Sequence, residues 1–464
     1  MRADRSRLPQ VGPDPVFVFP AIVRHTLANG LEVRTLEHHS VPVVTFVMQV
    51  DGGSGADPAG REGLAAMTAD MVDEGTGAMS AIDVSEALAM IGAEYDVDVG
   101  ADATVLTLTT LARFAERGSS ILADLLTRPS LRREDFDRVR QLRLDRLRQL
   151  KDSPPAVAER AFLRLLYGDH PYGHLSIGHD AALRRLDLAD VTTFHAATFA
   201  PSRSALVVAG AMSHERLLRL AEDAFGHWTD DDAARDAVPV AAADLEPAAA
   251  APRVAVVSRE GAAQSELRIG HLSARRDTPD YASLVVMNAL LGGQFVSRVN
   301  LKLREEKGYT YGARTGFDWR RGLAPFVLQA SVHTAATADA IRDSLHELDA
   351  IRGSRPPSDS EMTLAKASLT RGYPRNFETA NQVARSVAQL VLYDLPDSYF
   401  ENFVPRVNAV TAADVTRAAQ KYLDPARVTT LIVGDYAAIG RSLDALGLGD
   451  VQLQASDITD AGPS

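Results

Sequence analysis

Apolar positions along the chain recur at two spacings, one typical of strands and one typical of helices. Thr104–Leu111 alternates threonine with valine and leucine, which predicts a half-buried strand, whereas Val43–Val50 is apolar almost throughout and predicts a strongly buried one. Apolar residues at helical spacing lie in 63–74, 115–126 and 134–150. The second part of the chain repeats the scheme, with predicted strands at 267–271 and 326–332 and predicted helices at 281–290 and 337–351.

A weak internal repeat with an offset of 224 residues organises the chain. Asp190-Val191-Thr192, Pro201, Arg203 and Gly210 recur as Asp414-Val415-Thr416, Pro425, Arg427 and Gly434. In both copies the aspartate is expected to cap a short helix, a proline turn follows, and a buried strand ends at the glycine. Because the order of helix, turn and strand is kept together with the residues, we infer an internal duplication.

The segment between the two copies predicts a domain boundary. Residues 231–252 are rich in alanine, proline and acidic side chains and have no sustained apolar period, which is typical of a linker. An N-terminal domain at 17–230 and a C-terminal domain at 253–450 result, and 464 residues are indeed too many for one ordinary core. The predicted fold class is α+β, with two homologous sandwiches, each a mixed or antiparallel sheet with helices packed on it.

Composition excludes several classes of function. The net charge of −12 disfavours a nucleic-acid partner, since phosphate contacts require basic side chains. The absence of cysteine excludes disulfides, thiolate nucleophiles and cysteine-ligated zinc. No apolar run approaches the roughly 20 residues of a membrane helix, so no membrane partner is expected. We expect a soluble protein, in a bacterial-type cytoplasm if Met1 is native and in the periplasm if a signal peptide was removed.

The stretch from Gly52-Gly53-Ser54 to Gly75-Thr76 resembles the active-site segment of the pitrilysin/insulinase family of zinc peptidases. The family pattern is a Gly-Ser strand end, then Gly-Leu-Ala-His-x-x-Glu-His-Met, then Gly-Thr; Gly63-Leu64-Ala65 and Met71 match it here. This resemblance covers most of the chain, and it implies the two α+β halves together form one half of a clamshell chamber.

The chemical positions of that segment do not match the family. Ala66 and Asp70 stand where the resemblance places two zinc-binding histidines, and Ala69 stands where it places the glutamate base. Histidines four residues apart share one helix face and hold one metal ion, and the glutamate takes the proton of the metal-bound water. Alanine can do neither. A single carboxylate is a poor zinc site, so we interpret Asp70 as a solvated or capping side chain.

The third family ligand is missing as well. The resemblance implies a glutamate on a later helix, ahead of Asp152-Ser153-Pro154, but none occurs between Glu134 and Glu159, and the expected position falls at Asp145 or Arg146. With all three ligands and the base absent, we predict that this chain binds no cofactor itself and that zinc is held by a partner.

Three of the twelve histidines, His170, His174 and His179, cluster in a loop that also contains proline and glycine. A metal site is one interpretation of this cluster. A surface loop is the favoured one, because the family carries a similar His-Pro-Tyr-Gly segment and a loop cluster alone is weak evidence for a metal.

The second half carries a further match to the family. Its sequence Leu291-Gly292-Gly293, Ser297-Arg298 and 303–311 resembles the family's Gly-Gly…Ser-Arg-Leu…Leu-Arg-Glu-x-x-Gly-x-x-Tyr segment. In active members, an arginine and a tyrosine seven residues apart reach towards the zinc of the other half, and Arg304 and Tyr311 match that pair. A tyrosine hydroxyl can donate a hydrogen bond to a developing oxyanion, and an arginine fork can hold a substrate carbonyl.

Structural alternatives exist for these residues. Arg304 could form a helix-end ion pair with Glu305 or Glu306, and Tyr311 could be a strand core residue. The resemblance also implies a substrate-binding role for Gly292 and Gly293, for which a helix-to-helix turn is the alternative. No phosphate-binding glycine pattern is present there.

An intact arginine and tyrosine beside an erased zinc helix suggest division of labour between chains. The resemblance to the small-subunit branch of the family implies a heterodimer with a homologous subunit bearing His-x-x-Glu-His, and an unfolded peptide enclosed between the two chains. We expect this chain to supply Arg304 and Tyr311 to the partner's site. The alternative is an inert scaffold subunit of a larger complex. An independent hydrolase is disfavoured, since no complete catalytic set appears.

Overall fold

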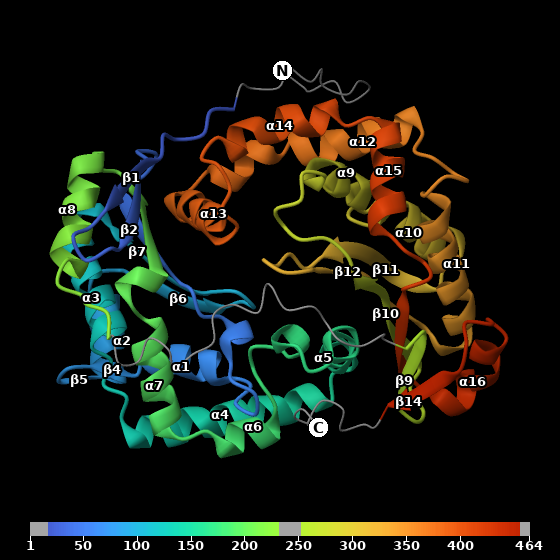
Figure 1. Ribbon diagram of the computed structural model, residues 1–464, viewed down its shortest axis with the longest axis horizontal. Helices are drawn as coiled ribbons and strands as arrows, with labels where there is room; N and C mark the ends of the chain where they lie inside the picture. Colours follow the sequence, from blue (N-terminus) through green and yellow to red (C-terminus); the bar gives the residue numbers. More distant parts are fainter. Residues whose placement is uncertain (1–16, 232–251, 455–464) are drawn as a thin grey trace, which may run out of the picture.

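A computed structural model describes residues 17–231 and 252–454 of the chain. The predicted linker, apart from its two end residues, lies outside these described residues. Two β-sheets stand on opposite sides of the molecule, the N-terminal one at the left and the C-terminal one at the right of Figure 1, and helices surround them. Within the described residues, no helix is long and apolar enough to cross a membrane.

The N-terminal sheet has six strands in the order β1-β2-β8-β3-β7-β6. All neighbours are antiparallel except β2 and β8, which are parallel. The two strands predicted from the apolar pattern, β3 and β7, are confirmed and lie side by side in register. The strands span Val23–Thr26 (β1), Glu32–Glu37 (β2), Val43–Val50 (β3), Glu94–Val99 (β6), Thr104–Leu111 (β7) and Ser204–Gly210 (β8); β4 (Gly75–Thr76) and β5 (Met79–Ser80) form a separate hairpin.

The C-terminal sheet repeats this topology in the order β11-β12-β10-β13-β9-β14. Five strands correspond in order and direction to β6-β7-β3-β8-β2, which confirms the duplication. The sixth differs: β14 runs parallel to β9, whereas β1 runs antiparallel to β2. The strands span Val254–Ser258 (β9), Gln264–Leu272 (β10), Thr310–Phe317 (β11), Pro325–His333 (β12), Thr429–Gly434 (β13) and Val451–Gln454 (β14).

The repeated helix of the duplication is present in both halves, but its cap differs from the expectation. The helices are α7 (Leu188–Thr198) and α15 (Ala412–Tyr422), and each starts with a capping box. The caps are Asp187 and Thr411, while Asp190 and Asp414 occupy the third helical position and bond back to the cap. The 224-residue repeat therefore predicts both helices correctly, but each helix is capped three residues earlier than predicted.

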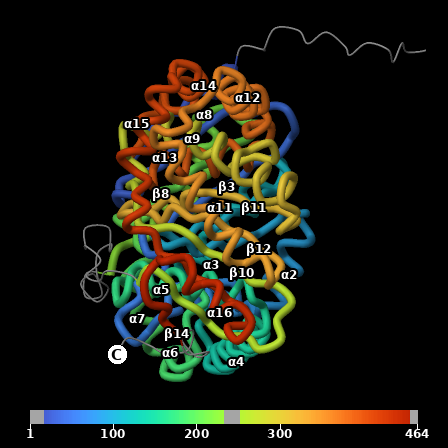
Figure 2. The backbone as a smooth tube through the Cα atoms, turned by 90° about the vertical axis from the view of Figure 1, so that its right-hand side faces the viewer, coloured from blue at the N-terminus to red at the C-terminus, as the bar shows by residue number. Residues whose placement is uncertain are grey.

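The predicted helices are confirmed within a few residues at each end. They are α1 (Leu64–Val72), α3 (Ala115–Thr127), α4 (Arg133–Lys151), α9 (Tyr281–Leu291) and α11 (Thr337–Ala350). The others include α2 (Ala81–Met90), α6 (Asp180–Arg185), α8 (His214–Phe225), α12 (Asp359–Thr370), α14 (Tyr399–Ala409) and α16 (Tyr436–Asp444). Figure 2 looks onto the C-terminal half from outside, where α11, α15 and α16 lie.

The two halves exchange one helix each. Helix α5 (Pro154–Tyr167), from the N-terminal part of the chain, packs on β10 and β13 of the C-terminal sheet, and helix α13 (Ala380–Leu392), from the C-terminal part, packs on β3 and β8. Both helices lie between the two sheets in Figure 1. Apolar side chains of α5 and α13 form separate buried clusters with those sheets. Each sheet is thus covered on its inner face by the other half's helix.

A loop between β11 and β12 fixes the halves to each other. The Arg321 amide donates to Asp102 Oδ2 at 2.9 Å, and Tyr172 donates its hydroxyl to the other oxygen of that carboxylate. The buried Arg320 guanidinium lies 5.0 Å from the ring centres of Tyr167 and Tyr172 and donates to the Tyr172 carbonyl. These cation–π and hydrogen-bonding contacts join residues far apart in sequence.

The helix exchange predicts that a cavity in α13 destabilises the N-terminal sheet. Val387→Ala removes a fully buried side chain of the cluster that α13 forms with that sheet and should cost about 1–3 kcal/mol of unfolding free energy. Hydrogen exchange should quicken at β3 and β8, measured by mass spectrometry. The exposed Leu142→Ala is the control and should change stability by less than about 0.5 kcal/mol. Faster exchange confined to β10 and β13 would contradict the expectation.

Candidate functional site

Helix α1 carries the three positions where the family resemblance places the zinc chemistry. It starts after Gly63, whose φ of 103° is left-handed and whose added Cβ would lie 3.0–3.1 Å from Leu183 and Gly178. Asp57 holds the helix start, with its carboxylate oxygens accepting from the amides of Gly63 at 2.6 Å and Ala65 at 2.7 Å. The start of the helix is therefore firmly held, although the helix carries neither the two histidines nor the glutamate of the family pattern.

The side chains at the zinc positions form an ion pair and an apolar surface. Ala66 and Ala69 are buried, and the Asp70 side chain is 44% exposed. Arg143 of α4 donates to Asp70 Oδ2 at 2.5 Å and to the Ser176 carbonyl at 3.1 Å. The sequence pattern predicts a solvated or capping side chain for Asp70. In the structure this partly exposed carboxylate instead pairs with Arg143 and joins α1 to α4.

Asp145 and Arg146, the two candidate positions for the third ligand, lie in different surroundings. Asp145 accepts from Gln141 and pairs with Arg148 along its own helix. Arg146 lines a pocket of about 370 Å³ whose other nine lining residues come from α1 and the residues after it, from β6, from α4 and from the histidine loop: Ala69, Asp70, Asp73, Glu74, Val97, Val139, Leu142, Arg143 and Ile177. The pocket at the former zinc positions therefore contains two guanidinium groups.

This pocket does not fit a zinc ion. Zinc sites require three or four nitrogen, sulfur or carboxylate ligands, and the only carboxylate left in the motif is bound by Arg143. Across the part of the chain that the structure describes, no group of three histidine, aspartate or glutamate side chains is arranged to hold a metal. Arginine stays charged at every relevant pH and repels a dication.

Asp73, on the wall of the same pocket, has a strongly perturbed pKa. Burial raises the pKa of Asp73 to about 6, and the neighbouring carboxylates of Glu74 and Asp70 add to the effect. The hydroxyl of Tyr95 is buried beside it with no hydrogen-bond partner, and burial raises the pKa of Tyr95 well above its usual range. The pocket thus disfavours additional negative charge at this point.

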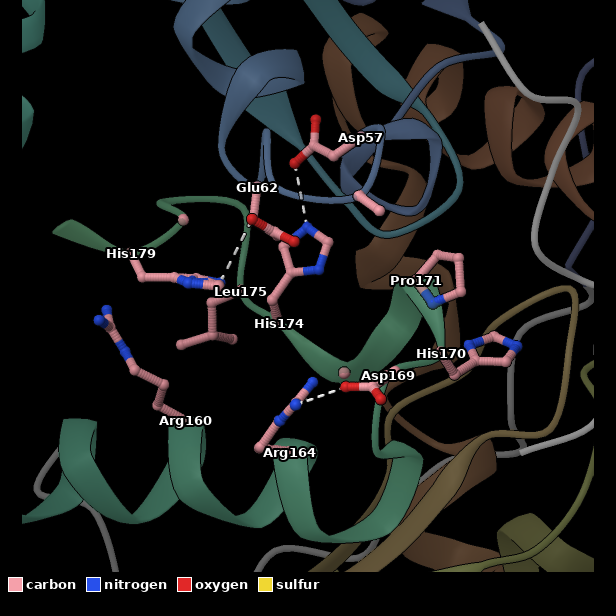
Figure 3. Close-up of a pocket in the computed structure, with 13 residues that line it drawn as sticks. Asp57, Glu62, Arg160, Arg164, Asp169, His170, Pro171, His174, Leu175 and His179 are labelled. Carbon is pink, nitrogen blue, oxygen red and sulfur yellow. Dashed lines mark hydrogen bonds and ion pairs between the residues drawn. The ribbon is translucent and has the colours of Figure 1, made fainter. Parts of the chain in front are cut away.

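Two histidines of the histidine loop, His174 and His179, contact acidic residues just before the start of α1. Figure 3 shows His174 facing Asp57 and His179 facing Glu62, at 3.0 Å and 3.7 Å between the paired atoms. His170 instead accepts from the Tyr172 amide through Nδ1 at 3.0 Å. The three histidines line a pocket of about 170 Å³ but have different partners, so they do not converge on one point as metal ligands would. The segment is not simply a surface loop either, because the His174 side chain is only 11% exposed and His179 is buried.

The structure places Arg304 and Tyr311 in the opposite half from α1. Arg304 lies in a π-helical turn (Leu301–Glu306) and Tyr311 on the edge strand β11. The Arg304 side chain is 37% exposed, pairs with Glu305 at 3.3 Å and lies 4.5 Å from the ring centre of Phe295. Tyr311 is 86% exposed. The ion-pair alternative holds for Arg304, whereas Tyr311 is not a strand core residue.

A buried asparagine braces the segment that presents this pair. Asn300 accepts from the Ala313 amide at 3.0 Å and donates to the Phe295 carbonyl at 2.8 Å. The contact with Ala313 lies where the register of β11 shifts against β12, between Thr310 and Ala313. Such a bulge re-aims side chains at a sheet edge, and here the irregular stretch contains the exposed Tyr311 and Gly312.

The two glycines differ in their surroundings. Gly292 ends α9, and its carbonyl accepts from the Thr315 amide at 3.1 Å; an added Cβ would lie 2.6 Å from that nitrogen. Close approach of α9 and β11 therefore requires glycine there. Gly293 is exposed, next to the exposed Phe295. Their substrate-binding role stays a prediction.

Several site residues were not anticipated from sequence. Arg143 and Asn300 have no motif signal, because their importance comes from partners distant along the chain. Arg298 did appear within a motif, but its function is structural: its Nε and Nη2 donate to both oxygens of Glu361 at 2.7 and 2.9 Å. Burial alone would raise the pKa of Glu361, but this pairing lowers it to about 2.

Comparison with known proteins finds family matches over most of the chain. Residues 33–178 match the model for insulinase (peptidase family M16), and residues 185–369 match the model for the peptidase M16 inactive domain. A Mycobacterium tuberculosis protein named an uncharacterized zinc protease is 24% identical over 86% of this chain and 90% of its own. A Helicobacter pylori protein named a non-peptidase homolog is 20% identical over 89% of this chain and 94% of its own.

The fold has a solved counterpart as well. A crystal structure described as the peptidase M16 inactive domain from Pseudomonas fluorescens superposes with a TM-score of 0.81 at 23% identity, covering 89% of this chain and 98% of that one. The likeness establishes the two-half fold over nearly the whole described chain.

The perturbed pKa of Asp73 predicts a pH-dependent gain in stability for Asp73→Asn. The folded protein binds this proton more tightly than the unfolded chain does, so the contribution of Asp73 to wild-type stability falls as pH rises from about 4 through about 6. At pH 7.5 the variant should be more stable by about 1–2 kcal/mol. Urea unfolding at pH 4 is the control, because the folded aspartate is then neutral and the gain should disappear. A gain of equal size at both pH values would contradict the burial argument.

Proposed function

The chain belongs to the M16 (insulinase) family of peptidases, and we propose that it is the zinc-free subunit of a heteromeric M16 peptidase. One observation carries the proposal: the N-terminal half has lost its metal ligands to alanine and an Asp70–Arg143 pair, while the C-terminal half keeps Arg304 and an exposed Tyr311. A homologous subunit with His-x-x-Glu-His would supply the zinc, and an unfolded peptide would be enclosed between the two.

The chemistry assigned to this chain is stabilisation of charge on the substrate. When a peptide bond is attacked, negative charge develops on its carbonyl oxygen, and the Tyr311 hydroxyl would donate a hydrogen bond to it. The Arg304 guanidinium would hold a neighbouring substrate carbonyl. Tyr311 is 86% exposed, so it contributes little to the chain's own core. Enclosure by a partner would remove water from both groups and strengthen these bonds.

The relatives support a division of labour without assigning it. One protein similar to this chain is named a zinc protease and another a non-peptidase homolog. Chains of about this length therefore carry both kinds of name within the family. The pocket with Arg143 and Arg146 supports placing this chain with the second kind.

The lost ligand set predicts that the isolated chain holds no zinc. After dialysis against zinc and then buffer, metal analysis should find well below one ion per chain, because Asp70 alone makes a weak site. A purified M16 subunit with His-x-x-Glu-His serves as the positive control. Stoichiometric zinc on this chain would contradict the proposal.

The exposed pair predicts a kinetic effect only in the assembled enzyme. With the zinc-bearing partner present, Tyr311→Phe should lower kcat by about 10²-fold with little change in KM, because an oxyanion donor acts mainly in the transition state. Arg304→Ala should lower kcat/KM by at least about tenfold.

Arg314→Ala is the matched control for these variants. Arg314 is exposed on the same strand as Tyr311, and its side chain donates to Gln329 Oε1 at 3.2 Å, so its removal should leave the kinetics unchanged. If Tyr311→Phe and Arg304→Ala behave like this control, the pair is not catalytic, and a scaffold role becomes the better explanation.

A further inference from the structure

The two side chains assigned to the substrate, Arg304 and Tyr311, stand on different elements, a π-helical turn and the edge strand β11. Two groups can act on one reacting carbonyl only if both are held close to the productive geometry, which requires support from behind. Tyr311 is 86% exposed, so packing around its ring supplies little of that support. Its position therefore depends on the backbone of β11.

A side chain from outside the sheet fixes this backbone next to Tyr311. The register of β11 against β12 shifts between Thr310 and Ala313, the stretch that contains the tyrosine. The Ala313 amide donates to Asn300 Oδ1 at 3.0 Å, and the Gly312 amide donates to Thr310 Oγ1 at 3.1 Å. Asn300 thus holds the irregular part of the strand directly after the exposed tyrosine.

The same asparagine holds the segment against which Arg304 lies. Its Nδ2 donates to the Phe295 carbonyl at 2.8 Å, and the ring centre of Phe295 is 4.5 Å from the Arg304 guanidinium carbon, a cation–π distance. Asn300 is only 3% exposed, so both of its hydrogen bonds are shielded from water, which strengthens them. Bonds from one buried side chain therefore reach the supports of both Arg304 and Tyr311.

These two bonds require an amide at position 300. One partner is a backbone N–H, which can only donate, and the other is a backbone C=O, which can only accept, so the orientation of the Asn300 amide is determined by its partners. An alanine would make neither bond. A carboxylate would keep an acceptor for Ala313 but would offer no proton to the Phe295 carbonyl.

We propose that Asn300 is a positioning residue that makes Arg304 and Tyr311 one unit for binding charge on a peptide carbonyl. The inference deepens the proposed function and rests on it for the roles of Arg304 and Tyr311. Asn300 itself touches no substrate. It keeps the backbone beside Tyr311 and the ring beside Arg304 in one fixed relation, and without it the two exposed side chains would move independently.

The first test uses the full chain alone, labelled with 3-fluorotyrosine and followed by ¹⁹F NMR. The chain has 11 tyrosines, and the resonance missing from Tyr311→Phe identifies residue 311. Asn300→Ala should shift or broaden this resonance, because the bond to the Ala313 amide is lost. Val299→Ala is the matched control: it removes a fully buried side chain at the neighbouring position but neither amide bond, and should leave the resonance in place. An unmoved resonance in Asn300→Ala would overturn the proposal.

The second test is kinetic and uses the enzyme assembled with its zinc-bearing partner, well below the melting temperature of each variant. Asn300→Ala should lower kcat by at least about tenfold with little change in KM. In the Arg304→Ala/Tyr311→Phe background the same substitution should cost less than about twofold more, because the groups that it positions are already gone. Val299→Ala should leave kcat and KM within about twofold of wild type.

The results separate this inference from the proposed function. Equal losses from Asn300→Ala in both backgrounds, or an equal loss from Val299→Ala, would mean that Asn300 only stabilises the fold. If Arg304→Ala and Tyr311→Phe leave the kinetics unchanged, the proposed function fails, and with it the catalytic purpose of Asn300. Where Asn300→Ala does not fold, Asn300→Asp carries the same comparisons, because it keeps the acceptor for the Ala313 amide and loses the donor to Phe295.

Discussion

Each sheet of this protein has two apolar faces to bury, and this requirement shapes the whole molecule. Strand β3 is buried along nearly its full length, so a helix layer on one side of its sheet is not enough. The second layer comes from the other half of the chain, as α13 on the N-terminal sheet and α5 on the C-terminal one. Burial of apolar area therefore couples the halves, and neither has a complete core without the other.

The same coupling fixes the positions of the polar contacts between the halves. Asp102 accepts from Tyr172 and from the amide of Arg321, and Arg320 lies against two tyrosine rings of the exchanged helix and its following turn. Buried charges persist when they are paired and hydrogen-bonded, as these are. The loop between β11 and β12 therefore holds the C-terminal edge strand, and with it Tyr311, at a set place relative to the N-terminal half.

The helix where the family resemblance places the metal ligands is held by contacts that involve no metal. Two buried alanines and an ion pair between α1 and α4 occupy those positions, and Asp57 holds the start of α1. Arg143 neutralises the charge of Asp70, whose carboxylate lines the same pocket as Asp73 and Glu74. The N-terminal half thus has a metal-independent surface around α1. In the C-terminal half, Asn300 and the bulge of β11 hold the segment that carries the exposed Tyr311.

The sequence alone determined the features that depend on local spacing. Period and apolarity predicted β3, β7 and the principal helices, because burial of one face imposes a repeat on neighbouring residues. The offset of 224 residues predicted the duplication, and the residues at 66, 69 and 70 predicted that this helix holds no zinc, since ligand chemistry depends on residue type.

Only the tertiary structure decided which segments meet. The partner of Asp70, the exchange of α5 and α13 and the exposure of Tyr311 depend on contacts between residues far apart in the chain, for which local spacing carries no signal. The physical reason is that an apolar stripe specifies that a helix must be covered and does not specify by which surface. A charged side chain likewise requires a partner or water, and the fold alone determines which one it finds.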